Sequence, residues 1–135
     1  MTRSPRLLRA DTGDVVVERL EVADSSWSRF KGLQFRRSLP PGGGLLLVPC
    51  PSVHTFFMCF PIDVLLLDRQ GVVVAVRRAV QPWRLVWPVR DSYATLEVPA
   101  NSATVGVGVA LRLEAADDVA PARSLAFLFP TSSVR

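Results

Sequence analysis

The sequence predicts a mainly β fold, a single compact β-sandwich or jelly-roll-like domain with one or two short helices. Three observations predict it. The apolar residues fall in short runs rich in valine, leucine and isoleucine, a pattern typical of strands. Eleven prolines and eight glycines interrupt these runs and mark turns. An apolar period of 3.6 residues is nearly absent, and many short strands without intervening helices are typical of sandwiches and barrels.

The first predicted elements are a strand and a short helix. Residues 15–22 are rich in β-branched side chains, which favours a strand. Asp24 suits the N-cap of a helix, and Gly32 suits the left-handed position that ends one. The sequence therefore predicts one helix over residues 24–32.

A loop and a series of strands follow. Two prolines and three glycines in residues 39–44 predict a loop, and the Gly-Lys-Ser/Thr of a phosphate-binding loop does not follow it. Gly71 is placed where a hairpin connection needs a positive φ. The predicted strands are residues 45–48, 53–59, 62–67, 72–77, 95–98, 104–107, 109–113 and 124–129.

Length and apolar content predict one ordered domain without a membrane span. A domain of 135 residues buries about 68% of the surface that its unfolded chain exposes, and a hydrophobic fraction of 49% favours an ordered core. The longest apolar runs, 44–48 and 62–67, are shorter than the roughly 20 residues of a membrane-spanning helix. The basic residues at the N-terminus precede no apolar segment of the kind a secretory signal carries. We therefore expect a cytoplasmic location.

Charge and cysteine content exclude several classes of function. The net charge is +4, and the basic residues, almost all arginine, are scattered along the chain. A nucleic-acid partner is not expected, since such proteins usually gather basic residues with aromatic platforms. Cys50 and Cys59 are too few for a disulfide framework, and with one histidine they are too few for a structural zinc site. We expect both to be small buried residues, and we predict no metal and no cofactor.

His54, the only histidine, is the first candidate for a functional site. If residues 53–59 form a regular strand, His54 and Cys59 lie on opposite faces. That placement counts against a Cys–His pair, unless a bulge before the following proline changes it.

Asp63 is the second candidate, because it lies inside an apolar run. A buried carboxylate needs a partner. The candidate partners are His54, Thr55, backbone amides near Phe60-Pro61, Arg36 and Arg84. We favour the structural interpretation, in which Asp63 accepts hydrogen bonds from neighbouring backbone amides.

Glu97 is the third candidate, since it too is flanked by apolar strand residues. One interpretation places it at a solvated edge. The other brings Glu97, Asp63 and His54 together in a carboxylate–imidazole site for acid–base chemistry or a metal ion. The tryptophans Trp83 and Trp87 lie in a proline-rich segment that predicts a surface loop, where they either stack on a ligand or cover the core.

Taken together, these segments resemble the DUF192 family of small bacterial and archaeal proteins. The resemblance extends from about residue 15 to about residue 113 and rests on the blocks 29–39, 44–46, 53–71 and 82–100. The chain departs from the family pattern at Asn101, where glycine is usual, and at Val109-Ala110, where Gly-Asp is usual. The resemblance implies a compact, mostly β, jelly-roll-like domain and carries no settled activity with it.

The predicted organisation has three parts. They are an N-terminal tail (1–12), a DUF192-like β domain (13–114) and a C-terminal extension (115–135) that could add a strand.

Three functions from different classes remain. The first is a module that binds a small ligand or a protein partner through His54, Thr55, Asp63, Arg84 and Glu97. The second is an accessory subunit of a larger complex, in which the apolar residues 125–129 complete the protein's own sheet or add to a partner's sheet edge. The third is a hydrolase or isomerase with His54 as the base and Asp63 orienting it. We rank binding first and expect a monomer or a weak homo-oligomer.

Overall fold

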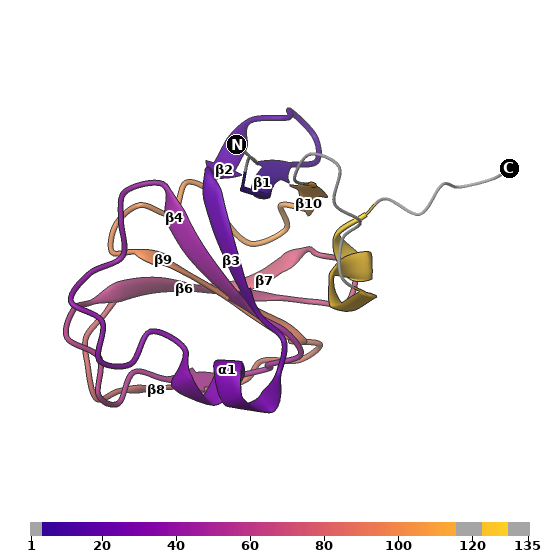
Figure 1. The fold of residues 1–135 in the computed structure, drawn as a ribbon. Coiled ribbons are helices and arrows are strands. Elements are labelled where there is room, and N and C mark those ends of the chain that lie inside the picture. Colours follow the sequence, from indigo (N-terminus) through magenta and orange to yellow (C-terminus); the bar gives the residue numbers. More distant parts are fainter. Residues whose placement is uncertain (1–3, 116–122, 130–135) are drawn as a thin grey trace, which may run out of the picture.

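The computed structural model describes residues 4–115 and 123–129 and contains three β-sheets, one α-helix and one 3-10 helix (Figure 1). The predicted fold class, mainly β, is confirmed. The elements are β1 (Arg6–Arg9), β2 (Val15–Val17), β3 (Arg19–Ala23), α1 (Ser26–Lys31), β4 (Gly43–Leu47), β5 (Val53–His54), β6 (Ile62–Leu67), β7 (Val73–Val80), β8 (Leu85–Val86), β9 (Ala94–Pro99), β10 (Leu111–Glu114) and η1 (Arg123–Leu128). No described helix is long and apolar enough to cross a membrane.

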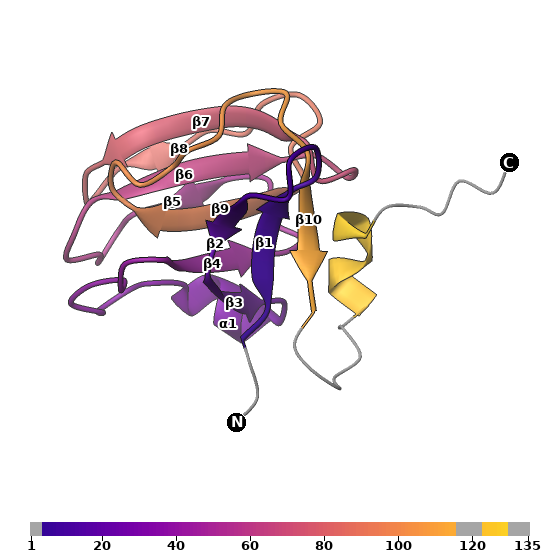
Figure 2. The same ribbon diagram turned by 90° about the horizontal axis from the view of Figure 1, so that it is seen from above.

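A five-stranded sheet forms the middle of the molecule, in the order β3-β4-β9-β6-β7, with only β3 and β4 parallel. The sheet β10-β1-β2 lies on one side of it, whereas α1 and the short pair β5-β8 lie on the other (Figure 1). Figure 2 shows β1 and β10 running across the direction of β4, β6 and β9. Because both faces of the middle sheet are covered, every residue of β4 and β6 is buried.

Strand alternation divides the core into two clusters. On β9, Leu96 and Val98 point towards β1 and β10. On β4, Leu45 and Leu47 point towards α1 and β8. Successive side chains of a strand lie on opposite faces, so Glu97, between Leu96 and Val98, points towards α1.

Three of the predicted strands before residue 108 differ in the structure. Residues 15–22 divide at Glu18 into β2 and β3, which belong to different sheets. Only the first two residues of 53–59 form a strand, because the chain turns at Phe57, which has a φ of 64°. Residues 104–107 form no strand, since they lie in a glycine-containing loop. By contrast, the predicted strand 62–67 matches β6 residue for residue.

The helix α1 is where the sequence predicts it, but Ser25 rather than Asp24 is its N-cap. The Ser25 hydroxyl accepts a hydrogen bond from the Ser28 amide at 3.0 Å, and the Ser28 hydroxyl in turn accepts from the Ser25 amide at 3.0 Å. This reciprocal pair is a capping box. Gly32 ends the helix with a φ of 46°.

The predicted N-terminal tail is also wrong in part. Residues Arg6–Arg9 form β1, which pairs with both β10 and β2, and Leu7 is completely buried. The sheet β10-β1-β2 therefore needs residues 6–9.

The C-terminal residues 124–129 do not form the predicted strand. They lie largely in η1, where Leu125 and Leu128 are buried in the core next to β10. A 3-10 helix brings residues three apart to the same side, so two leucines reach the core. The remainder of the extension lies outside the described residues.

We expect Leu128→Ala to lower the free energy of unfolding by about 3 kcal/mol, because it leaves a cavity in a packed core. Urea unfolding measures this change, and Ala126→Ser, at an exposed position of the same helix, is the control. A loss below 0.5 kcal/mol, typical of surface substitutions, would mean that η1 does not belong to the cooperative core.

Candidate functional site

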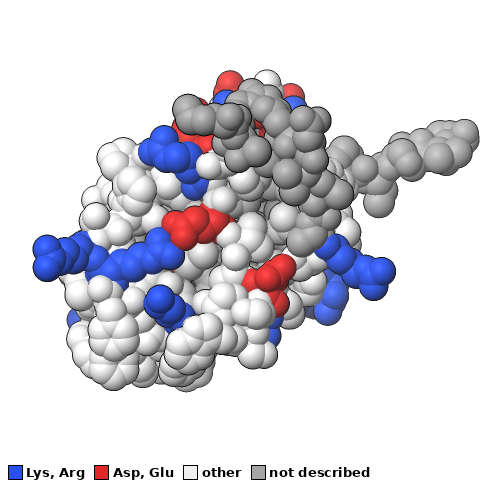
Figure 3. All heavy atoms as spheres, viewed as in Figure 1, with Lys and Arg blue, Asp and Glu red and all other residues white. Residues whose placement is uncertain are grey.

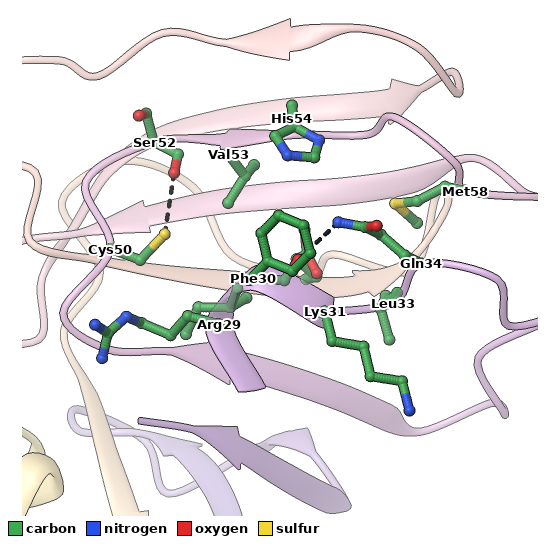
Figure 4. Close-up of a pocket in the computed structure, with 13 residues that line it drawn as sticks. Arg29, Phe30, Lys31, Leu33, Gln34, Cys50, Ser52, Val53, His54 and Met58 are labelled. Atoms are coloured by element: carbon green, nitrogen blue, oxygen red, sulfur yellow. Dashed lines mark hydrogen bonds between the residues drawn. The ribbon is translucent and has the colours of Figure 1, made fainter. Parts of the chain in front are cut away.

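A pocket of about 100 Å³ lies between α1 and β5 on one face of the middle sheet (Figure 4). We call it the α1–β5 pocket. In Figure 4 the Phe30 ring stands between Cys50 on one side and Gln34 on the other, and the long side chains of Arg29 and Lys31 extend away from it. Its lining residues are Arg29, Phe30, Lys31, Gly32, Leu33, Gln34, Leu47, Cys50, Ser52, Val53, His54, Met58 and Glu97.

Glu97 is the buried acidic residue of this pocket. It pairs with Leu45 of β4 and Val64 of β6, so it lies on an interior strand. The prediction of a solvated edge position is therefore wrong, because β9 has a neighbour on each side and Glu97 is only 3% exposed.

The carboxyl group of Glu97 is not satisfied by the protein. Its Oε1 atom is buried and accepts no hydrogen bond from residues 4–115 or 123–129. Burial raises the pKa of Glu97 to about 8, and the positive charge of Arg36 offsets this only in part. Arg36 itself is held by Glu21, through two hydrogen bonds of 2.8 and 2.9 Å. At neutral pH the Glu97 carboxyl group is therefore mostly protonated.

The end of α1 leaves room above this carboxyl group. A Cβ atom at Gly32 would lie 4.0 Å from Glu97 Oε1 and 3.8 Å from a methyl group of Leu47. Gly32 carries no side chain, so the backbone at the helix end comes close to Glu97. The helix end places no hydrogen-bond donor on Glu97 Oε1. The sequence predicts the turn at Gly32 but not that this turn lies against the carboxyl group of Glu97.

His54 and Cys50 are the other titratable groups nearest to the pocket floor. His54 Nδ1 accepts a hydrogen bond from the Phe56 amide at 3.2 Å, so the neutral imidazole carries its proton on Nε2. The Cys50 thiol donates to the Ser52 carbonyl at 3.0 Å. Burial raises the pKa of Cys50, against smaller opposing effects of hydrogen bonds from Thr95 and Ser52, so its thiolate is disfavoured.

Asp63 lies apart from the pocket and binds the backbone. Its Oδ1 accepts from the amides of Ala79 at 2.8 Å and Asn101 at 2.9 Å, and its Oδ2 accepts from Ala103 at 3.0 Å. Burial alone would raise the pKa of Asp63. These three hydrogen bonds and the charge of Arg78, 3.7 Å away, lower it below its ordinary value. The amides come from β7 and from the turn after β9, not from Phe60-Pro61.

A dyad of His54 and Asp63 is not present, because the Asp63 oxygens are occupied by these amides and no hydrogen bond joins the two side chains in the described part of the chain. Thr55 is completely buried, where its hydroxyl donates to the Gln81 carbonyl at 2.7 Å and accepts from the Arg84 amide at 2.8 Å. Of the five predicted ligand-binding residues, only His54 and Glu97 line the α1–β5 pocket.

Comparison with known proteins identifies the family. A model of the DUF192 family, described as Uncharacterized ACR, COG1430, matches residues 8–115. The chain belongs to the DUF192 family. It is 34% identical to a UPF0127 protein of Thermococcus sibiricus, over 84% of this chain and 72% of that protein. It is 32% identical to a UPF0127 protein of Pyrococcus abyssi, over 75% of this chain and 84% of that protein.

Two crystal structures share the fold of this DUF192 protein. A candidate transcription regulator from Sinorhizobium meliloti has a TM-score of 0.67 at 21% identity, covering 83% of this chain and 93% of that one. A protein of unknown function from Novosphingobium aromaticivorans has a TM-score of 0.68 at 19% identity, covering 80% of this chain and 82% of that one. At such identities the likeness shows the fold alone.

The two cysteines of the DUF192 protein differ from expectation. Cys59 is exposed and Cys50 half-buried, so the prediction that both are buried is wrong. No local pattern predicts that Cys50, Gln34 and Phe30 share a pocket with His54, because α1, β4 and β5 meet only in the folded chain. Among the described residues, no group of three or more His, Cys, Asp or Glu side chains is arranged to hold a metal ion.

Proposed function

We propose that this DUF192 protein binds a small organic acid in the α1–β5 pocket, with Glu97 donating a hydrogen bond to it. The observation that carries the proposal is the buried Oε1 of Glu97, which has no hydrogen-bond partner. A buried polar group without a partner costs about 1–3 kcal/mol. Such groups are rare in folded proteins and concentrate at functional sites.

The chemistry of the lining favours an acceptor ligand. A protonated Glu97 offers a hydroxyl donor, because its pKa is raised to about 8, and the neutral form of His54 offers Nε2–H. The basic residues Arg29 and Lys31 at the rim favour negative charge. Phe30 and Met58 supply an apolar wall.

The size of the pocket limits the ligand. A volume of about 100 Å³ is smaller than the roughly 150 Å³ of an apolar cavity that holds benzene. The ligand class that fits is therefore a carboxylate of about two to four carbons, with its oxygens towards Glu97.

The test is a thermal-unfolding panel of acetate, propionate, lactate and pyruvate at pH 6.5 and pH 9, with acetamide and ethylamine as matched neutral and cationic compounds. A ligand at 100 times its dissociation constant stabilises the folded state by about 2.7 kcal/mol. We expect stabilisation by a carboxylate at pH 6.5 and its loss at pH 9, because Glu97 ionises above its pKa of about 8 and then repels the ligand.

Three variants make the test specific. Glu97→Gln keeps a donor that does not titrate, so binding should persist at pH 9. Glu97→Leu removes the donor, so binding should be lost at both pH values. Asp11→Asn, an exposed position in the turn between β1 and β2, should leave binding unchanged. Stabilisation by ethylamine instead of carboxylates, or carboxylate binding that survives Glu97→Leu, would contradict the proposal.

A further inference from the structure

The exposed aromatic residues gather at the α1 and β8 end of the molecule. All six exposed Trp and Phe side chains of the described residues lie in α1 or in the loops next to β5 and β8, and we call this surface the aromatic end. Exposed fractions reach 71% for Trp27 and 72% for Trp87. Its members are Trp27, Phe30, Phe35, Phe57, Trp83 and Trp87.

Contacts between separate loops hold the aromatic end together. The rings of Phe35 and Phe57 lie 5.5 Å apart, and those of Phe57 and Trp83 lie 4.7 Å apart. The Phe35 amide donates to the Phe57 carbonyl at 3.0 Å, and the Trp83 amide donates to the Thr55 carbonyl at 3.0 Å. Three loops distant in sequence therefore present their rings on one surface.

The backbone is strained at these same three residues. Phe35, Phe57 and Trp83 have φ values of 66°, 64° and 67°, a region that bulky side chains rarely adopt. Strain of this kind is typical of functional sites. Here the strained backbone turns large apolar rings towards solvent, where they gain no free energy from burial. The exposure of these rings therefore indicates a surface that binds a partner.

Basic residues predominate in the sequence segments that form the aromatic end. No Asp or Glu occurs in residues 25–62 or 69–90, the two segments that hold all six aromatic residues. At the lower edge of Figure 3, over α1 and β8, the surface is white with blue side chains and no red ones. The basic residues of the two segments are Arg29, Lys31, Arg36, Arg37, Arg69, Arg77, Arg78, Arg84 and Arg90.

We propose that the aromatic end docks on the surface of an anionic lipid bilayer. Tryptophan and other aromatic rings prefer the headgroup level of a membrane, and basic residues close to it are attracted by anionic lipids. Arg29, Lys31 and Arg84 complement that negative charge, whereas Arg36 is paired with Glu21 and Arg78 lies 3.7 Å from Asp63. The aromatic end shares Phe30 and its neighbours Arg29 and Lys31 with the lining of the α1–β5 pocket, but this proposal does not require a ligand in the pocket.

The ring geometry favours a membrane over single-stranded nucleic acid. Bases bind by stacking on free aromatic faces. Trp27 is stacked on Phe30 at 5.9 Å, and Trp83 is stacked on Phe56 at 5.6 Å, so one face of each of these rings is already occupied. Insertion among lipid headgroups needs only exposed apolar edges.

The tryptophans supply the readout. All three tryptophans of the chain, Trp27, Trp83 and Trp87, lie at the aromatic end, so intrinsic fluorescence reports on this surface alone. The experiment titrates the full chain with vesicles of phosphatidylcholine, with or without 30% phosphatidylglycerol, at low and high salt. We expect a blue shift and quenching by brominated lipid with the anionic vesicles. We expect affinity about tenfold lower for the neutral vesicles, and lower affinity at high salt.

Two pairs of variants test the contributions of basic charge and of aromatic rings to vesicle binding. Arg84→Glu should weaken vesicle binding, whereas Arg112→Glu, the same charge change on β10 at the other end of the molecule (Figure 1), should not. Trp87→Ala should weaken binding, whereas Val107→Ala, exposed but outside the aromatic end, should not. Melting temperatures confirm that each variant is folded. No response to anionic vesicles would overturn the proposal, as would a response to polyuridylate without one to vesicles.

Discussion

Glu97→Gln is expected to raise the free energy of unfolding, and to raise it more at pH 9 than at pH 5. The pKa of Glu97 is about 8 in the folded protein against an ordinary value of 4.5. Between these two values the folded state holds a proton that the unfolded state has released. The stability of the wild type therefore falls as the pH rises through that window and stays low above it. Glutamine does not titrate, so the variant escapes this loss.

The expected size follows from the pKa difference. One pKa unit corresponds to 1.36 kcal/mol, so the gap between wild type and Glu97→Gln should widen by about 4 kcal/mol from pH 5 to pH 9. Urea unfolding of both proteins at pH 5, 7 and 9 measures it.

Asp11→Asn is the control for this prediction. The hydrogen bonds from Arg9 lower the pKa of Asp11, so Asp11 is ionised throughout the range from pH 5 to pH 9. It lies in the turn between β1 and β2, away from Glu97, so its gap to the wild type should stay constant. An equally constant gap for Glu97→Gln would show that the carboxyl group has an ordinary pKa, and it would remove the main support for the pocket as a binding site.

Asp63→Ala is expected to lower the free energy of unfolding by about 4 kcal/mol. The substitution leaves the amides of Ala79, Asn101 and Ala103 without their acceptor, and each unsatisfied buried donor costs about 1–3 kcal/mol. It also removes the link that joins the end of β7 to the turn after β9.

The matched control is Asp68→Ala. Asp68 also accepts two backbone hydrogen bonds, from Gln70 and Val72, but in a half-exposed turn where water can replace it. We expect a loss of about 1 kcal/mol there. A loss at Asp63 no larger than at Asp68 would contradict the role given to Asp63.

The pH dependence of Asp63 has the opposite sign to that of Glu97. Its folded pKa is lowered from 3.8. Its contribution to stability is therefore present above pH 3.8 and is lost as the pH falls through the folded value. Asp63→Ala should accordingly lose less of its stability in acid than the wild type does.

Sequence reasoning identified the features that depend on local pattern. The strand Ile62–Leu67 and the turn at Gly71 could be predicted because alternation and backbone freedom act over a few residues. The favoured interpretation of Asp63, backbone hydrogen bonding, rested on the cost of an unpaired buried charge, and the structure shows such hydrogen bonds. The donors themselves could not be named, because they lie 16 to 40 residues away.

The features that depend on tertiary contacts could not be predicted. The strand predicted for residues 53–59 ends early because the chain turns at Phe57. The prediction that His54 and Cys59 lie on opposite faces of one strand therefore does not apply. Phe35, Phe57 and Trp83 are distant in sequence, and their rings come together only when three loops meet. Glu97 was singled out correctly as unusual, but its place on an interior strand depends on β4 and β6, which pair with it from distant parts of the chain.

The division of the core by the middle sheet offers a route to protein engineering. Leu96 and Val98 pack in the core cluster that includes η1, whereas Glu97, between them, lines the α1–β5 pocket. Libraries that vary residues 29–34 and 50–54 would reshape the pocket while leaving the packing between the middle sheet and the sheet β10-β1-β2 intact. The fold thus provides a scaffold in which binding specificity can be changed on one side of a sheet and stability improved on the other.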